Sequence, residues 1–194
     1  MSINPNPELL VKLLSPRATL PAYQSAGAAG LDLSACLPAE TESLTIRPGE
    51  ILLVPTGLAI AVPPGFEGQV RARSGLATKH GIGLPNAPGT IDSDYRGELK
   101  VAVINFSTKP FEITHALRIA QLVVAPVAKA DIRVVSDLGE TTRGAGGFGS
   151  TGLSSTIEVR GGTALQSGVP GATTLQGGDA VSPKGAGPAP LTSR

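Results

Sequence analysis

The chain has 194 residues, of which 41% are hydrophobic and only 3% aromatic, and this length suits one domain of ordinary size with a tail. Its 25 glycines and 17 prolines disfavour a helix bundle, because both residues interrupt helices. With 16 basic and 15 acidic residues the net charge is +1, so we expect no broad basic surface and no nucleic-acid partner.

Cysteine content and hydropathy indicate the cellular compartment. The single cysteine, Cys36, excludes an intramolecular disulfide framework and a CxxC metal site. No apolar run approaches the ~18 residues that are needed to cross a bilayer, and the N-terminus lacks an export signal pattern. We therefore expect a soluble, cytoplasmic protein without a membrane partner.

Short apolar runs between turn signals predict a series of strands. In chain order the expected strands are Leu9–Leu14, Gly30–Ala35, Leu44–Ile46, Glu50–Pro55, Leu58–Val62, Phe66–Ala72, Leu99–Asn105, Phe111–Ile113, Arg118–Ala125 and Asp131–Val135. Only Ser74–Lys79 is expected to be helical, with Ser74 as its N-cap. The pattern predicts an all-β jelly-roll barrel or a similar two-sheet barrel.

The composition changes near residue 152. Residues 153–194 are rich in Gly, Ser, Thr, Ala and Pro and carry few large side chains, so we expect a disordered tail. The segment before it, 143–152, holds five glycines, Arg143, Phe148, Ser150 and Thr151. Glycine amides, an arginine fork and hydroxyls suit a phosphate, and the ring of Phe148 suits a ligand ring. A flexible glycine linker is the alternative.

Two further segments carry polar side chains at bends of the chain. At the expected strand-to-helix corner, the Arg73 guanidinium and the Ser74 and Gly75 amides could hold a phosphate, and a capped helix with a solvated arginine is the alternative. In the hairpin-like stretch 86–97, Asp92 and Asp94 share one face if the chain is extended, so either could orient a water molecule. Ordinary turn chemistry is the alternative there.

Two polar residues interrupt expected apolar strands. Asp32 lies between Leu31 and Leu33, so alternation directs it to the other face. It is either a solvent-facing strand residue or, beside phosphates, a carboxylate that holds Mg²⁺ through water. Gln121 is the one polar residue in the run 119–124, and burial there would require hydrogen-bond partners.

Taken in order, the segments AGLDLSA, RSGLA, GTIDSDYRG, RIAQL and RGAGGFGSTG resemble the five motifs of the trimeric dUTP diphosphatase (dUTPase) family, over residues 9–152. The resemblance implies a jelly-roll homotrimer whose active sites are shared between subunits. It also implies hydrolysis of dUTP to dUMP and diphosphate with Mg²⁺, which limits uracil incorporation into DNA and supplies dUMP for dTMP synthesis. On this basis residues 1–142 form the barrel, 143–152 an arm that closes over substrate, and 153–194 the tail.

The resemblance also assigns roles to individual residues. Asp32 would hold Mg²⁺ through water, and Asp92 would activate the attacking water. The phosphates would be bound by Arg73, Ser74, Gly75 and Gln121. The uracil and deoxyribose pocket would comprise Asn86, Thr90, Ile91, Tyr95 and Lys100, with Tyr95 excluding ribose. The arm would contribute Arg143, Phe148, Gly149 and Ser150.

Some positions depart from the family pattern, and two rival functions remain open. Ala72 stands where the family often has proline, and His115 begins a turn that usually contains glycine and an acidic residue. A dCTP deaminase of the same fold is one rival, which the second and fifth motifs disfavour. A catalytically silent regulator is the other, and the presence of Asp92 and Tyr95 argues against it.

Overall fold

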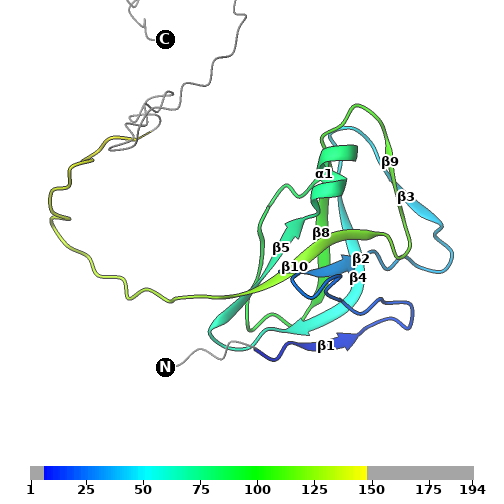
Figure 1. Ribbon diagram of the computed structural model, residues 1–194, viewed down its shortest axis with the longest axis horizontal. Coiled ribbons are helices and arrows are strands. Elements are labelled where there is room, and N and C mark those ends of the chain that lie inside the picture. Colours follow the sequence, from blue (N-terminus) through cyan, green and yellow to red (C-terminus); the bar gives the residue numbers. More distant parts are fainter. Residues whose placement is uncertain (1–6, 148–194) are drawn as a thin grey trace, which may run out of the picture. The chain divides into compact units, whose positions relative to one another are not determined.

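The computed structural model describes residues 7–147, which contain ten strands and one short helix (Figure 1). The elements are β1 (Leu10–Leu13), β2 (Leu31–Ser34), β3 (Ser43–Ile46), β4 (Ile51–Ala61), β5 (Phe66–Ala72), α1 (Ser74–His80), β6 (Ile82–Gly83), β7 (Gly89–Ile91), β8 (Glu98–Asn105), β9 (Phe111–Thr114) and β10 (Arg118–Pro126). The predicted all-β class is confirmed.

The strands form two four-stranded sheets and one two-stranded sheet. The first has the order β1-β4-β8-β6, the second β2-β10-β5-β7, and the third pairs β3 with β9. Every pairing is antiparallel, and Figure 1 shows β3 and β9, which are far apart in the sequence, side by side. Two packed antiparallel sheets agree with the expected jelly-roll barrel.

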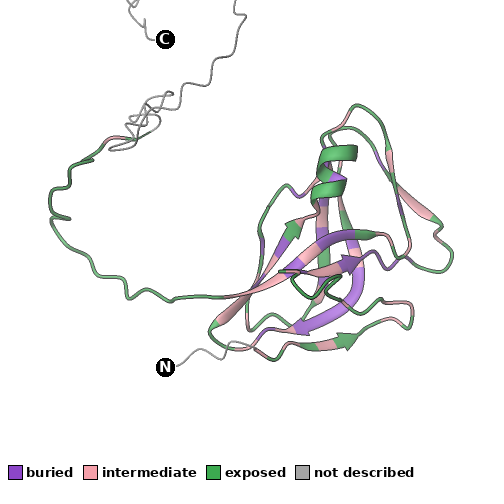
Figure 2. Cartoon of the chain, viewed as in Figure 1, coloured by how far each residue is buried: buried purple, intermediate pink, exposed green. Residues whose placement is uncertain are grey.

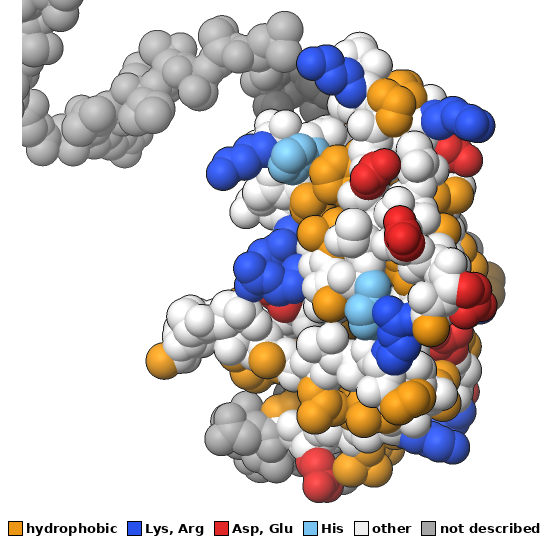
Figure 3. Space-filling model, turned by 90° about the vertical axis from the view of Figure 1, so that its right-hand side faces the viewer, with side chains coloured by type: hydrophobic (Ala, Val, Ile, Leu, Met, Phe, Trp, Pro, Cys, Tyr) orange, Lys and Arg blue, Asp and Glu red, His pale blue; other side chains and the backbone are white. Residues whose placement is uncertain are grey.

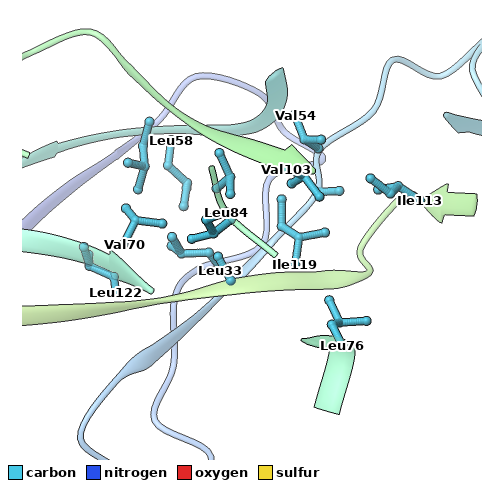
Figure 4. Packing of buried hydrophobic residues seen from close by; sticks show 14 of the residues in the cluster. Leu33, Val54, Leu58, Val70, Leu76, Leu84, Val103, Ile113, Ile119 and Leu122 are labelled. Atoms are coloured by element: carbon cyan, nitrogen blue, oxygen red, sulfur yellow. The ribbon is translucent and has the colours of Figure 1, made fainter. Parts of the chain in front are cut away.

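The core lies between the sheets and is built by strand alternation. In β8, Leu99, Val101 and Val103 are buried while the residues between them are more exposed. Leu33 of β2 and Leu122 of β10 are fully buried in the same cluster, which Figure 4 shows from close by. Figure 2 shows a long buried stretch on β4, whereas β1 is mostly exposed. Truncating such a core leucine to alanine costs about 2–5 kcal/mol.

A buried asparagine fixes the connection from β8 to β9. Asn105 has no exposed surface, and its Nδ2 donates hydrogen bonds to the carbonyls of Ile46 (3.0 Å) and Lys109 (2.8 Å). Its Oδ1 accepts from the backbone N–H of Ser107 at 2.9 Å. The side chain thus satisfies backbone groups of two connections at once, so it can be buried without an unpaired polar atom.

The structure corrects several details of the predicted elements. The runs Glu50–Pro55 and Leu58–Val62 belong to one strand, β4, whose pairing with β8 shifts between Pro55 and Ala59. The short strands β6 and β7 were not expected, because they lie in a stretch dominated by glycine and proline. Ser74 is not the N-cap of α1: Arg73 is, and it makes no side-chain cap.

The predicted strand Asp131–Val135 is wrong. These residues have no strand structure, and the side chains of Ile132 and Val134 are 96% and 94% exposed. A β-branched run becomes a strand only where a neighbour completes its hydrogen bonds, and no strand within residues 7–147 pairs with this segment.

The backbone contacts separate residues up to Val134 from those that follow it. In the second unit, residues 135–147 contain a turn in which the N–H of Gly144 donates to the carbonyl of Thr141 at 3.0 Å. The short helix α1 is the one helix within residues 7–147, and no helix there is long and apolar enough to cross a membrane.

Candidate functional site

Two pockets in the β-domain collect most of the residues that the sequence singled out. The first, the arginine pocket, has a volume of about 290 Å³ and is lined by Gln24, Ala28, Ala29, Gly30, Asp32, Arg73, Ser74, Gly75, Arg118 and Gln121. The second, the hairpin pocket, has a volume of about 380 Å³ and is lined by Leu53, Thr90, Ile91, Asp92, Tyr95, Glu98, Leu99 and Lys100.

The arginine pocket is organised around Asp32. Strand β2 directs Leu33 into the core and Asp32 to the opposite side, where its side chain is only 13% exposed. Its Oδ1 lies 3.3 Å from Nε of Arg73, and its Oδ2 accepts a hydrogen bond of 2.9 Å from Nη1 of Arg118. Asp32 is therefore an ion-paired residue rather than a solvent-facing one. Two guanidinium groups against one carboxylate leave a net positive charge, which suits an anion.

Gln121 closes one side of this pocket. It is opposite Asp32 in the β2–β10 register, and its Nε2 donates to the carbonyl of Ala72 at 3.0 Å, which supplies the partner that the sequence required. A Cβ added to Gly30 would lie 2.7 Å from Oε1 of Gln121. A side chain at Gly30, the residue just before β2, would have to displace the Gln121 amide, so Gly30 helps to set the shape of the pocket.

Helix α1 supplies the rest of the lining. Ser74 and Gly75 are in its first turn, where backbone N–H groups have no partner within the helix. Nη1 of Arg73 donates to the carbonyl of Arg118 at 3.1 Å and so ties the start of the helix to the start of β10. The four residues expected at the phosphates, Arg73, Ser74, Gly75 and Gln121, thus line one pocket.

Sequence reasoning missed two polar side chains that line the arginine pocket, Arg118 and Gln24. Arg118 lies three positions before Gln121 on β10, and this closeness to a predicted site residue is the signal that could have identified it. Gln24 lies in the loop before β2 and carries no motif, but its Oε1 accepts a hydrogen bond of 3.0 Å from Nη1 of Arg118. Only the fold brings these residues together.

The hairpin pocket is formed by the connection from β7 to β8. The N–H of Tyr95 donates to the carbonyl of Asp92 at 3.2 Å, which closes a turn. The Tyr95 hydroxyl donates to the carbonyl of Glu98 at 3.0 Å, and this position is open only because Gly97 has no side chain. Nζ of Lys100 lies 3.6 Å from Oε2 of Glu98. The pocket thus combines an aromatic ring, an exposed carboxylate and a lysine.

Asn86 extends this pocket inward. It lines a small cavity of about 40 Å³ together with Thr90, Ile91 and Lys100, all three of which also line the hairpin pocket. Gly89 and Ile91 belong to the edge strand β7, whose other side pairs with no strand of the described chain. An apolar floor beside unpaired strand amides and carbonyls suits a planar ring with hydrogen-bonding edges.

The two pockets lie far apart within one chain. The β5–β7 register places Ile91 opposite Gly68, and Asp92 is one residue beyond, while Arg73 lies five residues beyond Gly68 in the other direction. At about 3.3 Å per residue this separates Asp92 from Arg73 by about 20 Å. No residue lines both pockets. This backbone separation is too large for one phosphorus atom to lie beside both side chains in one copy of the chain.

The glycine-rich arm is described only in part. Within residues 135–147, Nε of Arg143 donates to the carbonyl of Gly146 at 2.8 Å and stabilises a local turn. The other expected arm residues, Phe148, Gly149 and Ser150, lie outside the described residues.

Charge and metal-binding groups are dispersed elsewhere. The face drawn in Figure 3 carries both Lys or Arg and Asp or Glu side chains, and neither sign of charge covers it. In the described part of the chain, three or more His, Cys, Asp or Glu side chains do not gather as a metal-binding cluster.

Comparisons with known proteins agree on one family. A family model described as dUTPase matches residues 16–152. The deoxyuridine 5'-triphosphate nucleotidohydrolase of Methylocella silvestris is 60% identical over 141 residues, which cover 73% of this chain and 88% of the relative. That of Rhizobium meliloti is 59% identical over 133 residues, covering 69% and 82%.

A solved structure gives the same result. It is a mutant dUTPase of Staphylococcus bacteriophage 80alpha with dUpNHpp, and it matches with a TM-score of 0.68 and 26% identity over 75% of this chain and 99% of that chain. The nearly all-β fold with one short helix is therefore that of an enzyme class, the jelly-roll nucleotidohydrolases. The chain belongs to the dUTPase family.

Proposed function

We propose that this chain hydrolyses dUTP to dUMP and diphosphate with Mg²⁺ as its cofactor. The observation that carries the proposal is the pair of pockets, one cationic and one lined by a ring, a carboxylate and a strand edge, in a chain of the dUTPase family. The reaction would limit uracil incorporation into DNA and supply dUMP for dTMP synthesis.

The arginine pocket would bind the triphosphate. Arg73 presents a guanidinium that Asp32 already orients, and Ser74 and Gly75 offer amides at the start of α1. Gln121 borders the same space. Because these donors are fixed before the substrate arrives, little reorganisation is needed when charge develops on the phosphates.

The hairpin pocket would bind uracil and deoxyribose. The edge of β7 near Thr90 and Ile91 would hydrogen-bond the base, with Asn86 deeper inside and Lys100 at the rim. Donors and acceptors that match uracil leave the amino group of cytosine unpaired, which rejects that base. The Tyr95 ring, held by its bond to Glu98, would lie against the sugar and exclude a 2′-hydroxyl.

Asp92 would orient the attacking water. Its side chain is exposed in the hairpin pocket and forms no ion pair with another side chain of residues 7–147. The water oxygen forms a bond to the α-phosphorus and its proton passes to Asp92, while the bond to the α–β bridging oxygen breaks and diphosphate leaves with that electron pair. The reaction needs no covalent nucleophile.

The residues present fit Mg²⁺ bound jointly with substrate. Among the described residues Asp32 is the one carboxylate that lines the arginine pocket, and its two oxygens already face arginines, so this part of the chain forms no all-protein cage there. Mg²⁺ commonly keeps several waters and binds through one or two carboxylates plus substrate phosphates. When bound, it would neutralise phosphate charge, and Asp32 would hold it through water.

The arm would complete the site. In this proposal Arg143, Phe148, Gly149 and Ser150 close over phosphate and uracil and exclude bulk water. Residues 143–152 would then act as a lid, and residues 153–194 would remain outside the catalytic unit.

A homotrimer with shared active sites would join the two pockets. The separation of about 20 Å between Asp92 and Arg73 within one chain supports their acting in different copies. The outward face of sheet β4–β8 supports a contact between copies: Ile51 is opposite Ile104 and Leu53 opposite Ala102, and Ile51 and Leu53 are 55% and 61% exposed. Leu53 also lines the hairpin pocket, so a copy packed on this face would border that pocket.

The experiment that tests the proposal measures diphosphate release from dUTP, dTTP, dCTP and UTP, each with and without Mg²⁺. We expect Mg²⁺-dependent release from dUTP alone. Ammonia release from dCTP would favour a deaminase, and silence with all four nucleotides from folded protein would favour a binding protein.

Asp92→Asn, compared with Asp94→Asn, tests the role of the carboxylate. Asp94 is also exposed and lies two residues away, but it does not line the hairpin pocket. We expect Asp92→Asn to lower kcat by about 10²–10⁴-fold with little change in substrate affinity. Asp94→Asn should leave turnover unchanged. Equal effects of both substitutions would remove Asp92 from its assigned role.

A further inference from the structure

A third pocket lies at the end of α1 opposite to the arginine pocket. It has a volume of about 300 Å³ and is lined by Lys79 and His80, which end the helix, and by the connection from β8 to β9. Ser74 begins the same helix, and a rise of 1.5 Å per residue separates the two ends by about 10 Å. We call this third site the lysine pocket. It shares no lining residue with the arginine pocket or the hairpin pocket.

Positive groups line the lysine pocket without a carboxylate to balance them. Lys79, His80 and Lys109 contribute to its walls, and no Asp or Glu among residues 7–147 lines it. Neither lysine forms an ion pair with an acidic side chain of that part of the chain. Thr108, also in the lining, has a backbone N–H and a hydroxyl that bond to no other group of the same residues. These donors are available to an anion.

The position of α1 explains only part of this charge. Lys79 and His80 are in the last turn of the helix, where positive side chains offset the negative end of the helix dipole. Lys109 has no such reason, because it lies outside the helix and contributes to the same pocket from the β8–β9 connection. Two lysines that converge from separate elements repel each other, and an anion between them removes that repulsion.

Hydrogen bonds fix both walls of the lysine pocket. The carbonyl of Lys109 accepts from Nδ2 of the fully buried Asn105 at 2.8 Å and from Oγ of Ser107 at 2.9 Å. The carbonyl of Gly81, which follows α1 with a φ of 67°, accepts from the N–H of Phe106 at 2.8 Å. A Cβ added to Gly81 would lie 2.9 Å from Cβ of Ser107, so a side chain there would push the walls apart. Walls that are fixed before a ligand arrives lower the entropic cost of binding.

One side of the pocket is apolar and aromatic. Pro110 and Phe111 line it, and the ring of His80 lies against that of Phe111 with ring centroids 5.1 Å apart and planes inclined at 51°. Phe111 also packs against the hydrophobic core, which holds its ring in place. An apolar wall beside cationic groups suits a ligand that carries a flat ring next to its charge. Small-molecule sites have volumes from about 300 Å³ upwards, so this pocket suits a ligand of one ring and one phosphate.

We propose that the lysine pocket binds a small phosphate monoester whose organic part carries a flat ring. Lys79, Lys109 and Thr108 hold the phosphate oxygens, and the ring lies against Pro110 and Phe111. The site is separate from the two pockets assigned to dUTP and does not rest on the proposed function.

The test follows backbone amide signals of the full-length protein by NMR, with phenyl phosphate and inorganic phosphate as separate probes. Phenyl phosphate carries a ring and a phosphate but no base or sugar that the hairpin pocket would select. Lys79→Gln combined with Lys109→Gln removes both charges. Lys12→Gln combined with Lys129→Gln is the matched control, since both lysines are exposed, lie outside the three pockets and change the net charge equally. Thermal unfolding of each variant checks the fold, and Arg73→Ala separates this site from the arginine pocket.

We expect phenyl phosphate to shift the amide signals of Gly81, Thr108 and Lys109 and to saturate them below about 10 mM. It should bind about 3–10-fold more tightly than inorganic phosphate, because the ring buries apolar surface. The variant without Lys79 and Lys109 should bind it about 10–100-fold more weakly, since two charge-assisted hydrogen bonds are lost. The control variant and Arg73→Ala should stay within about twofold of the unchanged chain, because separated exposed charges interact weakly.

Three results would overturn the proposal. One is an unchanged affinity for phenyl phosphate in the variant that lacks both lysines. Another is a set of shifts confined to residues 73–75, which would place the phosphate in the arginine pocket. The third is equal affinity for both probes, which would remove the ring from the site. Lysine-dependent binding of phenyl phosphate by a chain that does not hydrolyse dUTP would refute the proposed function and still support this inference.

Discussion

Two inactive variants should restore activity when they share one oligomer. Arg73→Ala removes the arginine that is expected at the phosphates, and Asp92→Asn removes the carboxylate that is expected at the water. The β5–β7 register puts these residues about 20 Å apart in one chain, which is too far for one substrate phosphorus to meet both. In the proposed trimer each site takes Asp92 from one copy and Arg73 from another.

The expected recovery can be calculated from random assembly. With equal amounts of both variants, half of the copies carry an intact Asp92 and half an intact Arg73, so about one quarter of the sites receive both. Co-expressed variants should show about a quarter of wild-type dUTP hydrolysis per subunit, while each variant alone loses about 10²–10⁴-fold. A mixed trimer, confirmed by light scattering and by two affinity tags, that remains inactive would refute the shared site.

Three further substitutions test the structure around this site. Gly30→Ala should displace the Gln121 amide and lower kcat/KM about tenfold, which corresponds to about 1.4 kcal/mol. Gly27→Ala, whose added Cβ would meet no atom, should leave kcat/KM unchanged. Steady-state kinetics of both variants measure the difference. Asn105→Ala should cost about 3 kcal/mol in urea unfolding, because buried backbone groups lose their partners, and a loss under about 1 kcal/mol would contradict this. Leu53→Glu should give monomers by light scattering, because a charge would be buried between copies, while Leu20→Glu, at 60% exposure, should not; an intact Leu53→Glu trimer would exclude the β4–β8 face.

The strands were predictable where one face of a strand is buried. Phe66–Ala72 was predicted with the observed bounds of β5, because its apolar residues alternate and turns delimit both ends. β4 was predicted as two strands, since Pro55 and Gly57 suggest a break, yet the strand continues through a register shift. The strand predicted at Asp131–Val135 was wrong, because a residue pattern that favours a strand has no partner among the described strands.

The sequence identified the segments that carry the site residues, but not how their side chains are arranged. Motifs identified Asp32, Arg73 and Gln121, and the fold places all three in the arginine pocket. The pairing of Asp32 with Arg118 was invisible in the sequence, because 86 positions separate them and antiparallel β2–β10 pairing alone brings them together. The sequence pattern therefore identifies the chemical groups of the site. Their ion pairs, and hence the orientation of each guanidinium, depend on how the strands pair in the folded chain.

The most direct test of the proposed reaction follows dUTP hydrolysis by phosphorus NMR in water labelled with heavy oxygen, with Mg²⁺ present. Attack of a water at the α-phosphorus predicts dUMP and diphosphate as the products, with the label in the dUMP phosphate alone. Label in diphosphate, release of dUDP with single phosphate, or intact dUTP after incubation with folded protein would contradict it.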